Sequence, residues 1–200
     1  FHYHRTDGTH WGCAYQGLGE LYSALGRAST ATLAIKVDER DHRSLYAAAM
    51  EHYNRGNTGL ALGYVERALG LAERGRYKVL RGFLLLFHKK YAPAQKMFEE
   101  ARAAKPAIPG PRAGLGHLAI IRRQYAIARS HLAASLEAWP PGNSRQWPAH
   151  DRLVYKMARM GLGWIAANQN QHEDAIQQFQ QILAREPDDL MGLLGKGNSL

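Results

Sequence analysis

Small and apolar residues recur along this chain with a period of about 34 residues, and that period sets its interpretation. The recurring pattern is a small residue, an aromatic or aliphatic residue one helical turn later, usually a second small residue after another turn, and then a proline. The clearest occurrences are Ala94, Phe98, Ala101, Pro106; Ala128, Leu132, Ser135, Pro140; and Ala175, Phe179, Ile182, Pro187. A fixed period of this length predicts stacked helical repeats rather than one globular core.

A second helical pattern is clearest near the N-terminus, where Tyr15, Leu18, Gly19 and Tyr22 share one helix face and Leu25 and Gly26 end the segment. Together the two patterns resemble the tetratricopeptide repeat (TPR), a pair of antiparallel helices with W-x2-L-G-x2-Y in the first and A-x3-F-x2-A-x4-P in the second. The resemblance covers nearly all of the chain from about Gly12 onward. It implies an all-α fold, a right-handed α-solenoid of TPR-like helix-turn-helix repeats.

The patterns divide the chain into five units and the opening of a sixth. Residues 1–11 are a leader or the end of a preceding helix, and the first four repeats are 12–41, 42–75, 76–108 and 109–142. An insertion loop follows at 143–155, and residues 156–200 hold the fifth repeat, whose first helix is lengthened, and the first helix of a sixth. The insertion is expected either to touch a partner or to be a passive turn. Because the last helix has no polar cap, the chain is expected to be a fragment of a longer array.

The spacing of small residues has a packing reason. Glycine or alanine at a helix crossing lets two backbones approach closely, and proline near the end of a second helix prevents its continuation. A bulky residue at Gly116 or Ala128 is therefore predicted to overpack its crossing.

The resemblance also implies a concave face lined by the first helix of each unit. The positions that often contact ligands in the family give an apolar and aromatic groove here. This partner-binding groove is predicted to contain Tyr46, Met50, Tyr53, Phe83, Phe87, His117, Ile121, Met160 and Trp164. Such a row suits an amphipathic helix or an apolar extended segment, with Phe83, Phe87 and Trp164 as anchors. The alternative is that another element or a second copy covers the face.

Some TPR relatives hold an acidic chaperone C-terminus with a clamp of Lys, Arg and Asn. The corresponding positions of this chain are Gln16, Glu20, Tyr46, Met50, Val79 and Phe83. These residues argue against a carboxylate clamp.

Cations gather at the turns between paired helices and predict a basic edge. Its members are Arg27, Arg55, Lys89, Lys90, Arg122 and Arg123. The helix dipole favours cations at helix C-termini, so such an edge also arises without a partner. The formal net charge of +9 and the pI near 9.8 favour acidic partners.

The sequence predicts neither catalysis nor a bound cofactor or metal. No nucleophile, base and orienting residue recur together, and the glycine pairs lie within helical periodicity with no strand before them. The single cysteine, Cys13, and the N-terminal His2, His4 and His10 lack the partners of a metal site. No segment approaches the roughly 18 uninterrupted apolar residues of a membrane span. A soluble protein is expected, with the cytoplasm favoured and the periplasm left open.

The function predicted from the sequence is a non-enzymatic scaffold for protein–protein interaction within a multiprotein assembly, with a partner helix or apolar segment in the groove. Two alternatives stay open: a regulatory or substrate-presenting region of a larger enzyme, and a basic edge that binds RNA or anionic membrane. The expected partner is a protein or peptide, with an acidic one favoured by charge. Peripheral membrane contact and self-association remain open, and nucleic acid is disfavoured.

Overall fold

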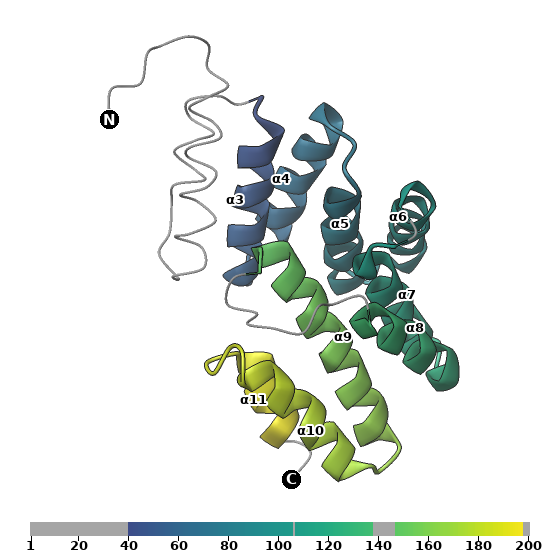
Figure 1. Ribbon diagram of the computed structural model, residues 1–200. Coiled ribbons are helices and arrows are strands. Elements are labelled where there is room, and N and C mark those ends of the chain that lie inside the picture. Colours follow the sequence, from purple (N-terminus) through teal and green to yellow (C-terminus); the bar gives the residue numbers. More distant parts are fainter. Residues whose placement is uncertain (1–39, 106, 138–146, 198–200) are drawn as a thin grey trace. The chain divides into compact units, whose positions relative to one another are not determined.

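The computed structural model describes residues 40–105, 107–137 and 147–197 (Figure 1). The leader at 1–11, nearly all of the expected first repeat at 12–41, and with it Arg27, lie outside these residues. The described residues form α-helices joined by turns, without β-strands. The chain divides into two units, Phe1–Lys90 and Tyr91–Leu200, and each is described by itself.

In the first unit, α3 (His42–Asn54) and α4 (Thr58–Leu71) pair across a short turn, and α5 (Gly75–Phe87) packs on α4. The side chain of Asp41 begins α3 by accepting hydrogen bonds from the backbone N–H groups of Arg43 and Ser44, at 3.0 and 3.1 Å. The buried residues of α4 are Ala61, Val65 and Ala68, which follow the small–apolar–small spacing. The two helices therefore pack through one buried face of α4.

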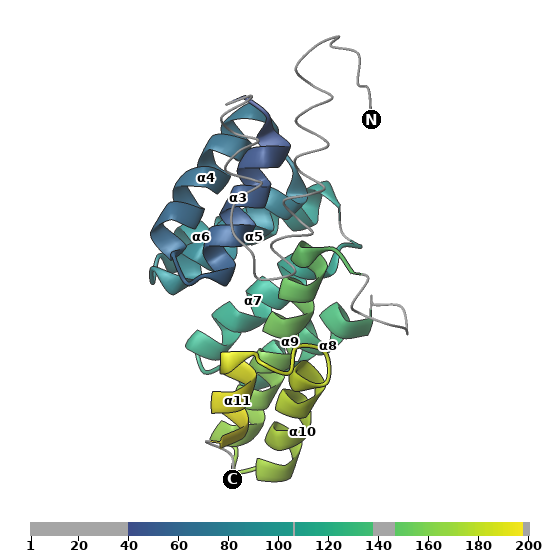
Figure 2. The same cartoon turned by 90° about the vertical axis from the view of Figure 1, so that its left-hand side faces the viewer.

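The second unit contains α6 (Tyr91–Ala104), α7 (Pro109–Ile121), α8 (Tyr125–Glu137), α9 (Ala149–Asn168), α10 (His172–Leu183) and α11 (Leu190–Gly197). Figure 2 shows α10 and α11 lying beside α9. The helices α7 and α8 form one pair and α9 and α10 the next. Pro109 stands at the first position of α7, where its fixed φ angle and missing N–H are tolerated.

The expected insertion loop is partly helical. The 20-residue helix α9 begins at Ala149, so residues 149–155 are helical and only 147 and 148 of the described residues precede it. Leu153, Val154 and Tyr155 are buried and extend the apolar face of α9 toward its N-terminus. The loop prediction was wrong over 149–155 because those apolar residues continue the helix, and the first helix of the fifth repeat is lengthened as expected.

Every described turn from a first to a second helix has the same backbone conformation. One residue takes a positive φ angle: Gly56 at 76°, Lys89 at 57°, Arg123 at 59° and Asn170 at 58°. The next N–H then reaches back across the helix end, as from Asn57 to the His52 carbonyl at 2.9 Å and from Gln124 to the Ala119 carbonyl at 2.9 Å. This pairing satisfies carbonyl groups that a helix end would otherwise leave free.

The second helices α6, α8 and α10 each bury a large apolar side chain at the same position of the repeat, Phe98, Leu132 or Phe179. Glycines of the preceding first helix leave space for two of them. A Cβ atom on Gly116 would lie 2.7 Å from Leu132 Cγ, and one on Gly163 would lie 2.7 Å from Phe179 Cζ. No real Cβ tolerates such distances, so these side chains require glycine opposite them.

Glycines of the following first helix also leave space for these side chains. A Cβ on Gly161 would lie 2.7 Å from Leu132 Cδ1, and Cβ atoms on Gly114 and Gly195 would overlap the rings of Phe98 and Phe179. Leu132 and Phe179 are therefore each held between glycines of two first helices, their own and the next one along.

This geometry predicts opposite effects for two glycine substitutions. Gly114→Ala should lower the free energy of unfolding by about 1–3 kcal/mol because the buried Phe98 ring cannot move away. Gly63→Ala, on the exposed side of α4 with nothing within 4 Å of a Cβ, should raise it by about 0.5–1 kcal/mol. Urea unfolding monitored by circular dichroism measures the free energy of unfolding of both variants. An unchanged stability of Gly114→Ala would contradict close packing of Gly114 against Phe98.

Candidate functional site

The residues predicted to line the groove separate by burial. Tyr46, Met50, Phe83 and Met160 are buried. Tyr46 stacks on Tyr77 with ring centroids 4.5 Å apart. Phe83, expected to anchor a partner, has no exposed surface, because its place in the middle of α5 lies within the packed part of the helix. These four residues are therefore not part of the surface that a partner can contact.

The exposed members lie toward the C-terminal ends of the first helices. Phe87 is the last residue of α5 and is 49% exposed, Ile121 is the last residue of α7 and is 46% exposed, and Trp164 in the last turns of α9 is 48% exposed. Sequence periodicity identified these three residues but did not distinguish them from the buried four.

In the first unit, Phe87 has an aromatic neighbour from α3. The rings of Tyr53 and Phe87 are tilted by 55° with centroids 5.9 Å apart. Such a tilted pair is a favourable aromatic arrangement, and it joins the C-terminal ends of α3 and α5. The half-buried Tyr53 and the exposed Phe87 thus form one aromatic corner.

In the second unit, α7 and α9 lie side by side and run parallel. The His117 Nε2 atom lies 2.7 Å from the Met157 carbonyl oxygen, and a Cβ on Gly161 would lie 3.3 Å from Ile120 Cδ1. In both contacts, the α9 residue follows the α7 residue by nearly the same number of positions in the sequence. Their register places Ile121 and Trp164 beyond them, toward the same end of the helix pair.

His117 is part of the α7–α9 contact rather than a surface ligand. Burial lowers the pKa of its imidazole, and the hydrogen bond to the Met157 carbonyl opposes that effect only partly. The ring is therefore neutral near pH 7 and donates its Nε2–H to the carbonyl. Protonation would place a charge inside the buried helix contact.

The lowered pKa of His117 predicts a loss of stability in acid. Because the folded-state pKa lies below the unfolded value of 6.5, the unfolded chain binds the proton first. Stability is complete above pH 6.5 and falls as the pH drops from 6.5 toward the folded-state pKa. His117→Gln, which keeps an N–H donor, should reduce the slope of unfolding free energy between pH 7 and 5.5, measured by urea titration at each pH. The same slope in both proteins would contradict this assignment.

The described members of the predicted basic edge, Arg55, Lys89, Lys90, Arg122 and Arg123, are all exposed at the turns between first and second helices. Arg55 pairs with Glu51 at 2.8 Å, and Arg122 donates from Nη2 to Gln95 Oε1 at 2.6 Å. Lys89 and Arg123 hold the positive-φ positions, where glycine is the favoured residue. These two cationic residues thus occupy positions where glycine would adopt the backbone conformation with less strain.

The positive φ angles predict that glycine stabilises the turns. Arg123→Gly should raise the free energy of unfolding by about 0.5–1 kcal/mol because it removes left-handed backbone strain. Gly56→Ala, at the equivalent turn, should lower it by about 1 kcal/mol for the opposite reason. Thermal unfolding of the two variants tests the pair, and a destabilised Arg123→Gly would mean that the arginine side chain stabilises the fold by more than its strain.

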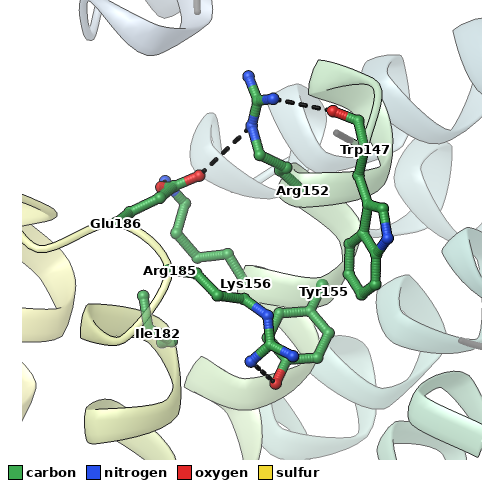
Figure 3. A pocket seen from close by; sticks show the side chains of 7 residues that line it. All are labelled: Trp147, Arg152, Tyr155, Lys156, Ile182, Arg185 and Glu186. Carbon is green, nitrogen blue, oxygen red and sulfur yellow. Dashed lines mark hydrogen bonds and ion pairs between the residues drawn. The ribbon is translucent and has the colours of Figure 1, made fainter. Parts of the chain in front are cut away.

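A small hollow lies beside the N-terminal half of α9 and is shown in Figure 3; its lining residues are Trp147, Arg152, Tyr155, Lys156, Ile182, Arg185 and Glu186. The Arg185 guanidinium stacks 4.2 Å from the Tyr155 ring centroid and donates to the Tyr155 hydroxyl at 2.6 Å. The Lys156 Nζ atom lies 3.1 Å from Glu186 and 2.7 Å from Asp189.

The volume of the hollow is about 10 Å³, enough for a single water molecule. These contacts hold the α10–α11 connection against α9. The cluster was not predicted from the sequence, although the one-turn spacing of Arg152, Tyr155, Lys156 and Arg159 on α9 was a usable signal. Within the described ranges, no group of three or more His, Cys, Asp or Glu residues is placed to hold a metal ion. Over the same ranges, no helix is long and apolar enough to cross a membrane.

No family model and no curated protein matches this sequence. Solved structures do match its backbone, among them a TPR protein of Thermus thermophilus with a TM-score of 0.70 and 16% sequence identity, covering 94% of this chain and 98% of that one. The chain has the tetratricopeptide-repeat fold. The helix pairs and their shared turns are thus TPR units, as the sequence resemblance implied.

Two further TPR structures share this fold. PilW, a type IV pilus biogenesis factor, has a TM-score of 0.62 at 18% identity, with 94% of this chain and 86% of PilW covered. YrrB, described as a TPR protein with an unusual peptide-binding site, has a TM-score of 0.53 at 17% identity, with 96% and 92% covered. At these identities the similarity establishes the fold alone.

Proposed function

We propose that this protein is a protein-interaction scaffold whose first helices dock an apolar segment of a partner at their C-terminal ends. The observation that carries the proposal is the exposure of a large apolar side chain toward the C-terminal end of three successive first helices: Phe87 on α5, Ile121 on α7 and Trp164 on α9. Most other large apolar side chains of these helices are buried. Exposed apolar residues that form a contiguous patch are typical of interaction surfaces.

The surroundings of Trp164 favour a role as an anchor. Its neighbours Gly163, Ile165 and Ala166 are buried, so the indole projects from a backbone that core packing holds in place. The Asn168 side chain donates to the Trp164 carbonyl at 2.8 Å and secures the last turn of the helix. A rigid, exposed tryptophan loses little conformational freedom on binding, and tryptophan is enriched among residues that dominate binding energies.

The aromatic corner of the first unit supplies a second contact of the same kind. Tyr53 covers one side of Phe87 and leaves about half of that side chain exposed. An apolar residue of a partner would bury the remaining surface and displace water from it. The adjacent Lys89 and Lys90 favour a partner with carboxylates close to its apolar residues.

The structural similarities support a peptide or protein as the partner class. YrrB is described as having a peptide-binding site and PilW as a pilus biogenesis factor, and both share the TPR fold with this chain. The fold serves many unrelated complexes, so it does not select one partner. A scaffold that presents a substrate to a larger enzyme would use this same surface, and the chain itself is proposed to be non-catalytic.

Selection from a library of random peptides tests the proposal, with the selected peptides standing in for the partner. A displayed library should yield binders with apolar residues spaced by three or four positions, flanked by Asp or Glu. Trp164→Arg or Phe87→Arg should lower the affinity for these peptides by roughly tenfold or more, because loss of an aromatic anchor typically removes at least about 2 kcal/mol of binding free energy. Fluorescence anisotropy measures the affinities, and circular dichroism checks that helix content is retained.

The matched control is Leu71→Arg. Leu71 is 47% exposed, close to the values of Phe87 and Trp164, but it ends the second helix α4. Its substitution should leave peptide affinity unchanged. Equal affinities of all three variants, or an equal loss at Leu71, would rule out the first-helix ends as the binding surface.

A further inference from the structure

Each unit has a turn edge, where the turns between first and second helices combine cations with exposed apolar residues. The cations of this turn edge are Arg55, Lys89, Lys90, Arg122 and Arg123. On the other side of the same turns, the second helices begin with the exposed Leu60 on α4, Tyr91 on α6 and Ile127 on α8. Cations at these turns are thus bracketed by large apolar side chains.

Acidic residues are missing from these turns. The sequence contains no Asp or Glu in 52–65, 74–98 or 101–136, stretches that include every residue of the turn edge. The nearest carboxylate that contacts the edge, Glu51, is paired with Arg55. The turn between α9 and α10 differs, since it consists of Gln169, Asn170 and Gln171 and is followed by Glu173 and Asp174. The turn between α9 and α10 therefore lacks such cations.

Side-chain contacts hold neighbouring turns together within each unit. In the first unit, the Tyr53–Phe87 ring pair places the end of α3 beside the end of α5. In the second unit, the hydrogen bond from Arg122 Nη2 to Gln95 Oε1 holds the α7–α8 turn against the first turns of α6, where Tyr91 lies. Each unit thus presents its own stretch of mixed basic and apolar edge.

We propose that the turn edge binds the surface of a bilayer that contains anionic lipids. Its lysines and arginines would pair with lipid headgroups, and Leu60, Tyr91 and Ile127 would enter the interfacial layer. Peripheral membrane binding depends on this combination of buried apolar area and attraction to anionic lipid. The proposed membrane contact is additional to the peptide docking proposed above. Its apolar residues lie on the second helices, whereas Lys89 and Lys90 would take part in both contacts.

One observation favours lipid over nucleic acid. Two of the three exposed apolar residues are Leu60 and Ile127, whose aliphatic side chains offer no stacking surface for the bases of single-stranded nucleic acids.

The helix dipole alone does not explain the edge. It favours cations at helix C-termini, but it provides no reason for exposed Leu60 and Ile127 at the start of the next helices. Nor does it account for Lys89 and Arg123 at positive-φ positions that favour glycine.

Vesicle sedimentation tests the charged part of the proposal with the 200-residue chain. The protein should bind vesicles of phosphatidylcholine that contain about a third phosphatidylserine, and it should bind pure phosphatidylcholine vesicles only weakly. Added salt should reduce the binding. The double variant Arg122→Glu with Arg123→Glu should lower the partition coefficient by roughly tenfold or more, because each cation near an anionic surface contributes about fivefold. The control variant Arg102→Glu with Lys105→Glu changes the net charge by the same amount at the exposed far end of α6. It should lower the partition coefficient by less than about threefold.

The apolar part has its own matched pair. Ile127→Ser should weaken vesicle binding several-fold, and Leu71→Ser, a similarly exposed change at the far end of α4, should not. Circular dichroism confirms that each variant is folded. Trp164→Arg should keep full vesicle binding, so failure of the peptide-docking proposal is separable from failure of this one.

Three results would overturn the membrane proposal. The first is no preference for phosphatidylserine vesicles. The second is an equal loss in the two charge-reversal variants, which would reflect net charge rather than the turn edge. The third is full binding by Ile127→Ser, which would leave a purely electrostatic edge suited to an acidic protein or RNA.

Discussion

Insertion of one large side chain between two first helices is the constraint on which the described repeats depend. Leu132 is enclosed by Gly116 of its own repeat and Gly161 of the next, and Phe179 by Gly163 and Gly195. Because glycine is the only residue that fits at these distances, the volume of the second-helix residue and the absence of a Cβ opposite it must be specified together. The same side chain fixes the crossing within a repeat and the stacking onto the next repeat.

The earlier repeat shows the complementary choice. Val65 occupies the place of Phe98 and Leu132 in α4, and Leu80 of α5 stands where α7 has Gly114; both Val65 and Leu80 are buried. A smaller second-helix residue thus accompanies a larger first-helix residue. The sizes of the two residues thus change in opposite directions between repeats, which is the kind of exchange that protein cores tolerate.

The fold could be predicted from sequence because helix pairing leaves a regular signal. The spacing of Ala128 and Leu132, and the glycine at position 116, reports contacts within a repeat and so recurs with its period. Gly114 and Gly161 contact the preceding repeat and were not distinguished from ordinary helix residues. The start of α9 was misplaced because proline and tryptophan before it resemble a loop, whereas burial of Leu153 and Val154 extends the helix.

The candidate site was only partly predictable, because the helical period identifies which face of a helix is turned inward but not how deeply each residue lies. Phe83 and Phe87 share one face of α5 by sequence, yet Phe83 is buried in the packed middle and Phe87 is exposed at the end. The pairing of Arg185 with Tyr155 depends on contacts between α9 and the end of α10, which no local pattern encodes.

The ends of the first helices join the packing of the fold to its proposed function. Glycines of α7 and α9 lie where these helices pack against large side chains, whereas Phe87, Ile121 and Trp164 are exposed toward the helix ends. The turn that follows must adopt a left-handed residue, which places Lys89 and Arg123 beside the exposed side chains. One repeated piece of backbone geometry thereby creates both proposed surfaces.

The most direct test of partner docking at the first-helix ends is photo-crosslinking in the native cell from probes placed singly at Phe87, Trp164 and Leu71, with captured proteins identified by mass spectrometry. The same protein should be captured from Phe87 and Trp164, and the similarly exposed Leu71 should capture little of it. Equal capture from all three positions, or adducts of this chain alone, would contradict a partner-binding surface at the first-helix ends.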